Sequence, residues 1–396
     1  MLHSFAFSNF QSFRERTEVS WQVDQRNASA AWSLDADTGG RLSTVMAVIG
    51  PNASGKTGLL KPVVFVHWFM AHSFQMEPSA PLPFSPHPAG ADEATEFEAE
   101  IDFDGQLWRY TLRATQQRVL HEALYVKRQR MGYVFVREWD EARQAYTVKQ
   151  QDFGFAPSEA VKVRPNASLI ATAAQYGVPL ALRMVAPYVW SNIHQYGRMV
   201  QDSNQLIAAA KLFANHDAHR ASMTQLLSQW DLGLSDVQLK EFEVAGPDNT
   251  QQKLWRPYGF HKMHDGSSFA LDFAQESSGT QGAFILLSRL LPVLETGGLA
   301  VIDEFENDLH PHMLEPILDL FANPRTNPHK AQLLFTCHAL EVLNLLHKSQ
   351  VILVEKNEFN ESSAWRLDSV EGIRADHNYY AKYLSLIHIS EPTRLG

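Results

Sequence analysis

The chain has 396 residues, which at about 150 residues per domain favours two to three domains. Hydrophobic residues make up 45% and charged residues 20%, so a disordered chain, a collagen-like repeat and a disulfide scaffold are excluded. The 44 acidic and 34 basic residues give a net charge of -10, which argues against a general polyanion-binding protein and leaves a local basic groove open.

Neither export nor membrane insertion is indicated by the sequence. The opening MLHSFAFSNF lacks the basic region and apolar core of a secretory signal. The longest apolar stretches, 63–70 and 284–294, are interrupted by His67 and Arg289 and fall short of the about 18 residues that a membrane span needs. The single cysteine, Cys337, cannot form an internal disulfide, which fits a reducing compartment. We therefore expect a cytoplasmic protein.

The last residues have an unusual character. Residues 384–394 read LSLIHISEPTR, which resembles the translation of a sequencing-library adapter. We interpret 384–396 as a non-native tail on a bacterial fragment and leave it out of the fold prediction, with an ordinary short tail as the alternative.

The first part of the chain, 1–165, predicts strands of two kinds. Residues 45–49 form a compact apolar run that ends at Gly50, as a buried parallel strand does. Residues 97–103 alternate between apolar and acidic, and Asp104-Gly105 predicts a hairpin turn to a strand that carries Arg109 and Arg113. The acidic side chains could be a metal site, but we favour a solvated strand face opposite the arginines. This part is expected to form an antiparallel β lobe beside the start of a central sheet.

The rest of the chain predicts a helical segment and then an α/β unit. We expect 166–265 to be a mainly helical insertion. From 266 to 383, short apolar strands at 299–302, 333–336 and 351–354 alternate with helical patterns, which indicates a parallel sheet flanked by helices. The expected fold class is therefore α/β with a mostly parallel central sheet, an N-terminal antiparallel β lobe and a helical insertion.

The strongest motif follows the strand at 45–49. The residues GPNASGKT, 50–57, match the phosphate-binding pattern G-x-x-x-x-G-K-[ST], in which backbone N–H groups at a helix N-terminus cradle phosphates. A lysine there reaches the β- and γ-phosphates, and the next hydroxyl ligates Mg²⁺. The residues expected to bind the nucleotide are Gly50, Asn52, Ser54, Gly55, Lys56 and Thr57.

A second motif ends the strand at 299–302. It delivers Asp303 and Glu304 to the carboxyl edge of the sheet, where ligands of open α/β sheets bind. We expect Asp303 to hold Mg²⁺ together with Thr57, and Glu304 to act as the catalytic group that polarises the attacking water. The spacing and order make the chain a predicted P-loop NTPase.

Two weaker motifs flank this strand. Glu276-Ser277-Ser278-Gly279-Thr280-Gln281 places the Ser278 hydroxyl and the Gly279 N–H at the start of a helix expected near Gly282, where an anion binds. The strand at 333–336 presents His338 at its end.

The ordered set of four motifs resembles the ATP-binding cassette (ABC) type of head. More narrowly, it is similar to AAA-family ATPases related to SMC proteins and to the overcoming-lysogenization-defect (OLD) nucleases. The segments 9–13 and 309–311 are also similar to that family's first strand and to its segment after the Walker B strand. The resemblance implies that Ser278 and Gly279 form a signature that closes on the ATP of a second subunit, and that His338 is a catalytic switch histidine at the γ-phosphate.

Two departures from the family's pattern stand out. The signature has Thr280 where a second glycine is common, and the glutamine of the Q-loop has no assigned position. His310 and His312 could suggest a metal, but we favour an interface loop.

Several functions follow from these expectations. The leading one is an ATP-hydrolysing dimer switch with ATP and Mg²⁺ as cofactors, acting on an effector or nuclease partner in phage defence or DNA transactions, with nucleic acid as an open partner. The alternative is the head of an OLD-type nuclease whose TOPRIM domain is missing, because Leu353-Val354-Glu355 resembles the strand that opens such a domain and no paired acidic motif follows before Tyr383. A transporter ATPase needs no such long insertion between Thr57 and Ser278, and a pure binding protein needs no Glu304.

Overall fold

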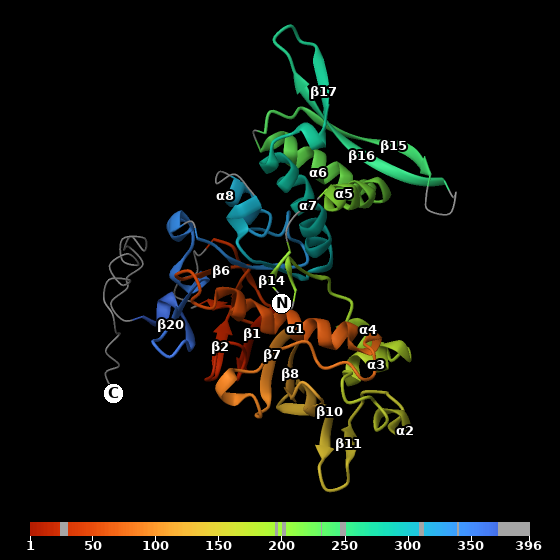
Figure 1. Cartoon of the computed structure of the whole chain (residues 1–396), viewed down its shortest axis with the longest axis vertical. Helices are drawn as coiled ribbons and strands as arrows, with labels where there is room; N and C mark the ends of the chain where they lie inside the picture. The colour runs from red at the N-terminus through yellow and green to blue at the C-terminus, as the bar shows by residue number, and fades with distance from the viewer. Residues whose placement is uncertain are drawn as a thin grey trace.

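The computed structural model describes residues 1–23, 31–194, 197–199, 203–230, 232–245, 251–308, 313–338 and 340–370. Two large sheets organise these residues, and helix α1 (Lys56–His72) lies between them (Figure 1). A smaller three-stranded sheet projects from one end of the molecule (Figure 1). The expected mixed α/β class is confirmed. The tail 384–396 and the segment 309–312, with His310 and His312, lie outside the described residues.

The central sheet has the strand order β12-β18-β19-β6-β20-β21. Its first five strands run parallel, and β21 pairs antiparallel with β20 at the edge. Every residue of β6, β18 and β19 is buried, because protein covers both faces of the sheet, and this accounts for their unbroken apolar runs. The parallel strands expected from the sequence are confirmed. The bounds are β12 (Val189–Ser191), β18 (Leu299–Ile302), β19 (Gln332–Thr336), β6 (Val45–Ile49), β20 (Val351–Lys356) and β21 (Ser362–Arg366).

The second large sheet is the expected antiparallel lobe. Its order is β11-β10-β9-β8-β7-β1-β2, and Asp104-Gly105 forms the β7–β8 turn. Arg109 lies opposite Glu100 on the solvated face and bonds to it at 2.7 Å, as expected for a charged face. No described residues form a cluster suited to a metal. The bounds are β1 (Leu2–Ser8), β2 (Thr17–Ser20), β7 (Thr95–Phe103), β8 (Gln106–Ala114), β9 (Val119–Lys127), β10 (Met131–Asp140) and β11 (Ala145–Gln150).

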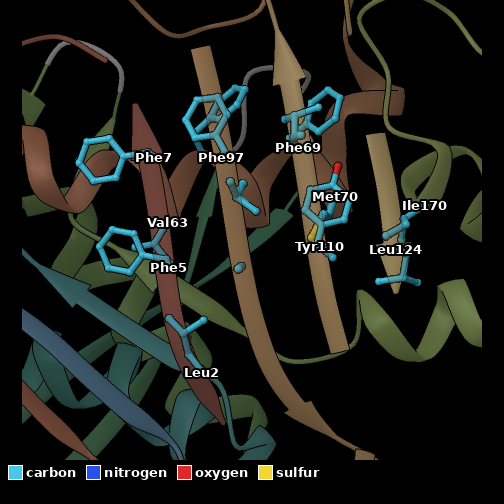
Figure 2. Packing of buried hydrophobic residues seen from close by; sticks show 14 of the residues in the cluster. Leu2, Phe5, Phe7, Val63, Phe69, Met70, Phe97, Tyr110, Leu124 and Ile170 are labelled. Atoms are coloured by element: carbon cyan, nitrogen blue, oxygen red, sulfur yellow. The ribbon is translucent and has the colours of Figure 1, made fainter. Parts of the chain in front are cut away.

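The central sheet divides the hydrophobic interior into two cores. Met46 and Val48 of β6 face the core shared with the lobe, whereas Val45, Ala47 and Ile49 face the other. In the first core, α1 packs against the lobe, and Figure 2 shows its side chains beside those of β1, β7 and β8. The second core is formed with helices α5, α6, α7 and α8. Besides α1, the α-helices of the described chain are α2 (Pro157–Ala160), α3 (Leu169–Gln175), α4 (Pro179–Met184), α5 (Ser203–Asn215), α6 (Asp217–Gln229), α7 (Ser278–Thr296) and α8 (Leu314–Asp319).

The segment 166–265, expected to be mainly helical, contains helices and strands. Helices α3 to α6 lie in it, but so does β12, which joins the central sheet beside β18. Its last part forms the projecting antiparallel sheet β15-β16-β17, whose one face packs toward α5 and α6. The sequence missed these strands because β12 is only three residues long and because the long hairpin mixes polar and aromatic residues without strict alternation. The strands are β13 (Ile193–His194), β14 (Gly197–Arg198), β15 (Asp236–Ala245), β16 (Gln251–Lys262) and β17 (Ser268–Asp272).

Two local expectations need correction. The segment 9–13 is no strand: β1 ends at Ser8, and Asn9 and Gln11 have φ angles of 53° and 49° in a tight turn. The turn buries its two phenylalanines while the chain reverses direction. Helix α7 begins at Ser278, four residues before the expected start, because the Ser277 hydroxyl accepts a hydrogen bond from the N–H of Thr280 and caps the helix.

The small sheet β3-β5-β4 completes the described strands near the N-terminal part, with β3 (Gln22–Val23), β4 (Ser33–Asp35) and β5 (Arg41–Ser43). Within the described ranges, no helix has the length and continuous hydrophobicity that crossing a bilayer requires.

Candidate functional site

The loop between β6 and α1 is built for a close approach to its backbone. A side chain at Gly50 would place its Cβ 2.2 Å from the carbonyl oxygen of Val354, so only glycine fits. Gly55, with φ of 111°, caps α1 in the left-handed region and lies against Ser362. The Ser362 hydroxyl donates to the carbonyl of Ser54 at 2.6 Å and fixes the loop against β21. The loop therefore leads into the N-terminus of a 17-residue helix, where phosphates commonly bind.

Lys56 and Thr57 begin α1 and face the loop and the neighbouring strand. The Lys56 amine donates to the carbonyls of Gly50 at 2.8 Å and Pro51 at 2.9 Å. Burial lowers the pKa of Lys56, while the nearby charge of Asp303 acts in the opposite direction. The Thr57 hydroxyl donates to the carboxylate of Asp303 at 2.7 Å and so links the loop to the end of β18.

Asp303 is 4% exposed and is held from three sides. The hydroxyls of Thr57 and Thr336 each donate to one of its carboxylate oxygens at 2.7 Å. Asn192, just after β12, accepts from the Asp303 N–H at 2.8 Å and donates to its carbonyl at 2.9 Å. Helix α1 and strand β19 therefore fix the side chain of Asp303, and the residue after β12 fixes its backbone, all at the carboxyl edge of the sheet.

Glu304 follows in a conformation that few non-glycine residues adopt. Its φ is 52°, and its N–H donates to the Thr336 hydroxyl at 2.6 Å. The Glu304 carboxylate is 38% exposed and lies 3.9 Å from the Arg198 guanidinium of β14. A left-handed residue of this kind persists only where its surroundings hold it, and such residues concentrate at functional sites.

His338 lies at the same edge, two residues after β19 ends. Its N–H donates to the Glu306 carboxylate at 2.5 Å, and its side chain is exposed. The other carboxylate oxygen of Glu306 and the hydroxyl of Ser54 are buried and have no hydrogen-bond partner within the described part of the chain. Buried polar atoms of this kind favour a site that a polar ligand completes.

The signature-like residues lie elsewhere. Ser278 and Gly279 form the first turn of α7, and no hydrogen bond among the described residues joins them to the phosphate-binding loop or to Asp303. Ser278 is exposed, and its hydroxyl has no hydrogen-bond partner in the described ranges, because the cap of α7 is Ser277. The structure thus brings together 50–57, Asp303, Glu304 and His338, and leaves Ser278 and Gly279 apart on the surface.

Four residues of the edge were not singled out from the sequence: Asn192, Arg198, Glu306 and Thr336. Thr336 is the last residue of a predicted strand, so a hydroxyl at a carboxyl edge was a usable signal. Asn192 and Arg198 lie in the segment that was expected to be helical, which hid them.

The residues present fit a nucleotide and a divalent cation. The unpartnered Ser54 hydroxyl and the Lys56 amine, which bonds only to backbone carbonyls in this loop, suit a polyphosphate. A threonine hydroxyl bonded to a buried carboxylate is the oxygen donor set that Mg²⁺ takes beside a phosphate.

A phosphate-binding loop after the central strand of a parallel sheet, with an acidic pair on a neighbouring strand, defines a P-loop NTPase of ABC-like layout. A family model described as "AAA domain, putative AbiEii toxin, Type IV TA system" matches residues 45–344. The chain belongs to this AAA family, whose members are ATPases.

Three solved structures are similar at low identity. The SMC head bound to the C-winged helix domain of ScpA has 11% identity and a TM-score of 0.47, over 94% of this chain and 99% of that one. The SMC head domain from Thermotoga maritima has 13% identity and a TM-score of 0.43, over 92% and 98%. The Smc head domain with coiled coil and joint derived from Pyrococcus yayanosii has 9% identity and a TM-score of 0.43, over 98% and 99%. No curated protein matches the chain.

Proposed function

We propose that this protein binds and hydrolyses ATP in the cytoplasm and that ATP joins two copies into a dimer, which acts as a switch. The observation that carries this proposal is the Thr57–Asp303 hydrogen bond of 2.7 Å, which ties the phosphate-binding loop to the strand that presents Glu304. Membership of an AAA family supports ATP as the nucleotide.

The proposed roles follow from the positions of the side chains. The N–H groups of the loop and the Lys56 amine bind the phosphates, once that amine leaves the Gly50 and Pro51 carbonyls. Thr57 and Asp303 would hold Mg²⁺, which supplies positive charge beside the transferred phosphoryl group. Glu304 accepts a proton from the attacking water, and His338 contacts the γ-phosphate.

The dimer part of the proposal rests on the first turn of α7, which contains Ser278 and Gly279 and is called the signature turn from here on. Ser278 is exposed at the N-terminus of a 19-residue helix, where N–H groups and the helix dipole favour an anion. Since no hydrogen bond among the described residues joins this turn to the loop of its own chain, we assign it to the nucleotide of a second copy. The family description names a toxin and a toxin–antitoxin system, which supports a role in bacterial defence through an effector partner.

The test is Glu304→Gln, which keeps the shape of the side chain and removes its charge. Phosphate release should fall by about 10²- to 10⁴-fold while ATP binding is retained. Because ATP is no longer consumed, the dimer should accumulate, and light scattering with ATP and Mg²⁺ measures it. Glu355→Gln is the matched control, since Glu355 lies at the same edge on β20 and has no role in the proposal.

Parent-like phosphate release in Glu304→Gln would contradict the hydrolytic role of Glu304. Loss of release without an accumulated dimer would retain the ATPase and contradict the switch.

A further inference from the structure

The projecting sheet is continuous with the signature turn. Strand β17 leads into the short helix η4 (Phe273–Gln275), which Asp272 caps by accepting from the N–H of Ala274. Glu276 follows, and Ser277 then caps α7. Only four residues therefore separate the end of the sheet from Ser277.

A second connection runs through the side chain of Glu276. Its carboxylate bonds to the Nε2 of His261 on β16 at 2.8 Å and is 7% exposed. The Nδ1 of the same ring lies 2.9 Å from the carbonyl of Gly233, and Phe269 of β17 stacks on the ring. Both ring nitrogens of His261 thus lie within hydrogen-bond distance of an oxygen atom. Through the His261 ring, the Glu276 carboxylate is therefore connected to strands β16 and β17 and to Gly233 in the loop before the sheet.

The backbone of Gly259 packs closely against this carboxylate. A Cβ built on Gly259 would lie 2.5 Å from the Glu276 Oε1 and 2.6 Å from the Leu234 side chain. On the other side, the Glu276 carbonyl accepts from the Gln281 side chain at 2.9 Å, across the first turn of α7. Glu276 is therefore bonded to the sheet by its side chain and to the signature turn by its backbone.

We propose that Glu276 is a positioning residue for the signature turn: its bond to His261 sets Ser278 and Gly279 relative to the sheet β15-β16-β17, so that this sheet controls closure on the ATP of a second copy. The inference rests on the proposed function and adds the element that regulates it. Glu276 touches no nucleotide in this assignment and acts through the turn that follows it.

The experiment uses complementation between two variants of the full chain. Glu276→Ala should bind ATP as the parent does, because the phosphate-binding loop is unchanged, but release phosphate at least about 10-fold more slowly, since misplaced groups lose rate steeply. Glu304→Gln should also fail to release phosphate. When the two are mixed before ATP is added, a mixed dimer has one complete site, with Glu304 from the first variant and Ser278 from the second. Phosphate release should return to as much as about a quarter of the parent value, as two-fold symmetry allows.

A Glu276→Ala chain that misfolds globally could not supply Glu304 to a mixed dimer, so recovery would exclude global misfolding as the cause of the slow release. Gly259→Ala provides a second route, because it displaces the carboxylate without removing either ionisable group, and it should lower phosphate release in the same direction. Glu276→Gln keeps an acceptor for His261 and should retain more turnover than Glu276→Ala. The matched control is Glu241→Gln, which breaks the 2.7 Å Lys253–Glu241 ion pair of the same sheet away from the signature.

Parent-like turnover in Glu276→Ala, or no recovery in a mixture whose Glu304→Gln partner dimerises normally, would overturn the inference. The Glu304→Gln variant alone tests the proposed function separately. Normal phosphate release, or no ATP-dependent dimer, in that variant would contradict the dimer switch, and the inference about Glu276 would fail with it.

Discussion

Two buried carboxylates, one in the lobe and one at the edge of the central sheet, differ in how the fold compensates their charge. Glu122 of β9 is fully buried and pairs with the buried Arg137, and it also accepts from Tyr110, Ser168 and the N–H of Leu169. Asp303 is buried almost as deeply, yet its carboxylate bonds only to two neutral hydroxyls, and no ion pair joins it within the described residues.

The difference lies in where each charge is compensated. The guanidinium and the N-terminus of α3 neutralise Glu122 inside the fold, so that charge is part of the stable core. Asp303 has no ion pair within the described residues, although the charges of Lys56 and Lys61 interact with it from a distance. The nearby Ser54 hydroxyl and one Glu306 carboxylate oxygen also have no partner there, and this combination favours a ligand site. Mutations in the two regions should therefore affect different measurements.

The largest effect should come from Lys56→Ala at the central sheet. This change removes the cation that would balance the phosphates, so ATP binding should be abolished, while the midpoint of thermal unfolding without ATP should stay close to that of the parent. A titration with fluorescent ATP measures the first quantity. Lys61→Ala is the control, because it removes another partly buried lysine from the same helix. Retained ATP affinity in Lys56→Ala would contradict the assignment of Lys56 to phosphate binding, and with it the contrast between the central sheet and the lobe.

In the lobe, Glu122→Ala should have the opposite outcome: lower stability with unchanged ATP binding. Removal of one partner leaves the Arg137 cation buried and uncompensated, so the free energy of unfolding should fall by about 3–5 kcal/mol. Urea denaturation measures the loss. At a temperature where the variant is folded, its ATP affinity should equal that of the parent, and a change in affinity without loss of stability would contradict the structural assignment.

Thr336→Val tests a residue that is expected to support both the fold and the candidate site. It removes a donor to Asp303 and the acceptor of the Glu304 N–H, which should cost about 1–3 kcal/mol of stability. It should also slow phosphate release, because both acidic residues lose a positioning contact. Stability and turnover are measured on the same preparation, with the isosteric shape of valine as the steric control. Loss of stability with parent-like turnover would show that Thr336 supports the fold alone.

The smallest effect is expected for Arg109→Ala on the solvated face of the lobe. Arg109 is 40% exposed, and water and salt screen its bond to Glu100. The free energy of unfolding should change by less than about 1 kcal/mol, and ATP affinity should be unchanged. A loss as large as that of Glu122→Ala would show that solvent exposure does not decide how much the Arg109–Glu100 and Arg137–Glu122 ion pairs contribute to stability.

Much of the fold could be predicted because the buried parallel strands are short, fully apolar and followed by glycine or by acidic residues. The run 45–49 and the run 299–302 are of this kind, and each is followed directly by the residues predicted for the site. The strands β12 and β15 to β17 could not be predicted in the same way. The first draws its stability from pairing with β18, and the others from packing toward α5 and α6, and neither contact is local in the sequence.

The sequence by itself determined the motifs of this protein and the strands that carry them: the pattern GPNASGKT at 50–57, the acidic pair Asp303 and Glu304, and the buried parallel strands before them. These are local signals, because a turn that needs glycine and a strand buried on both faces restrict the residue types directly. Only the tertiary structure decided which side chains hold Asp303, that Ser277 caps α7 in place of Ser278, and that Glu276 bonds to His261. Those contacts join residues from separate strands and helices, and their energies depend on distances that no local pattern encodes.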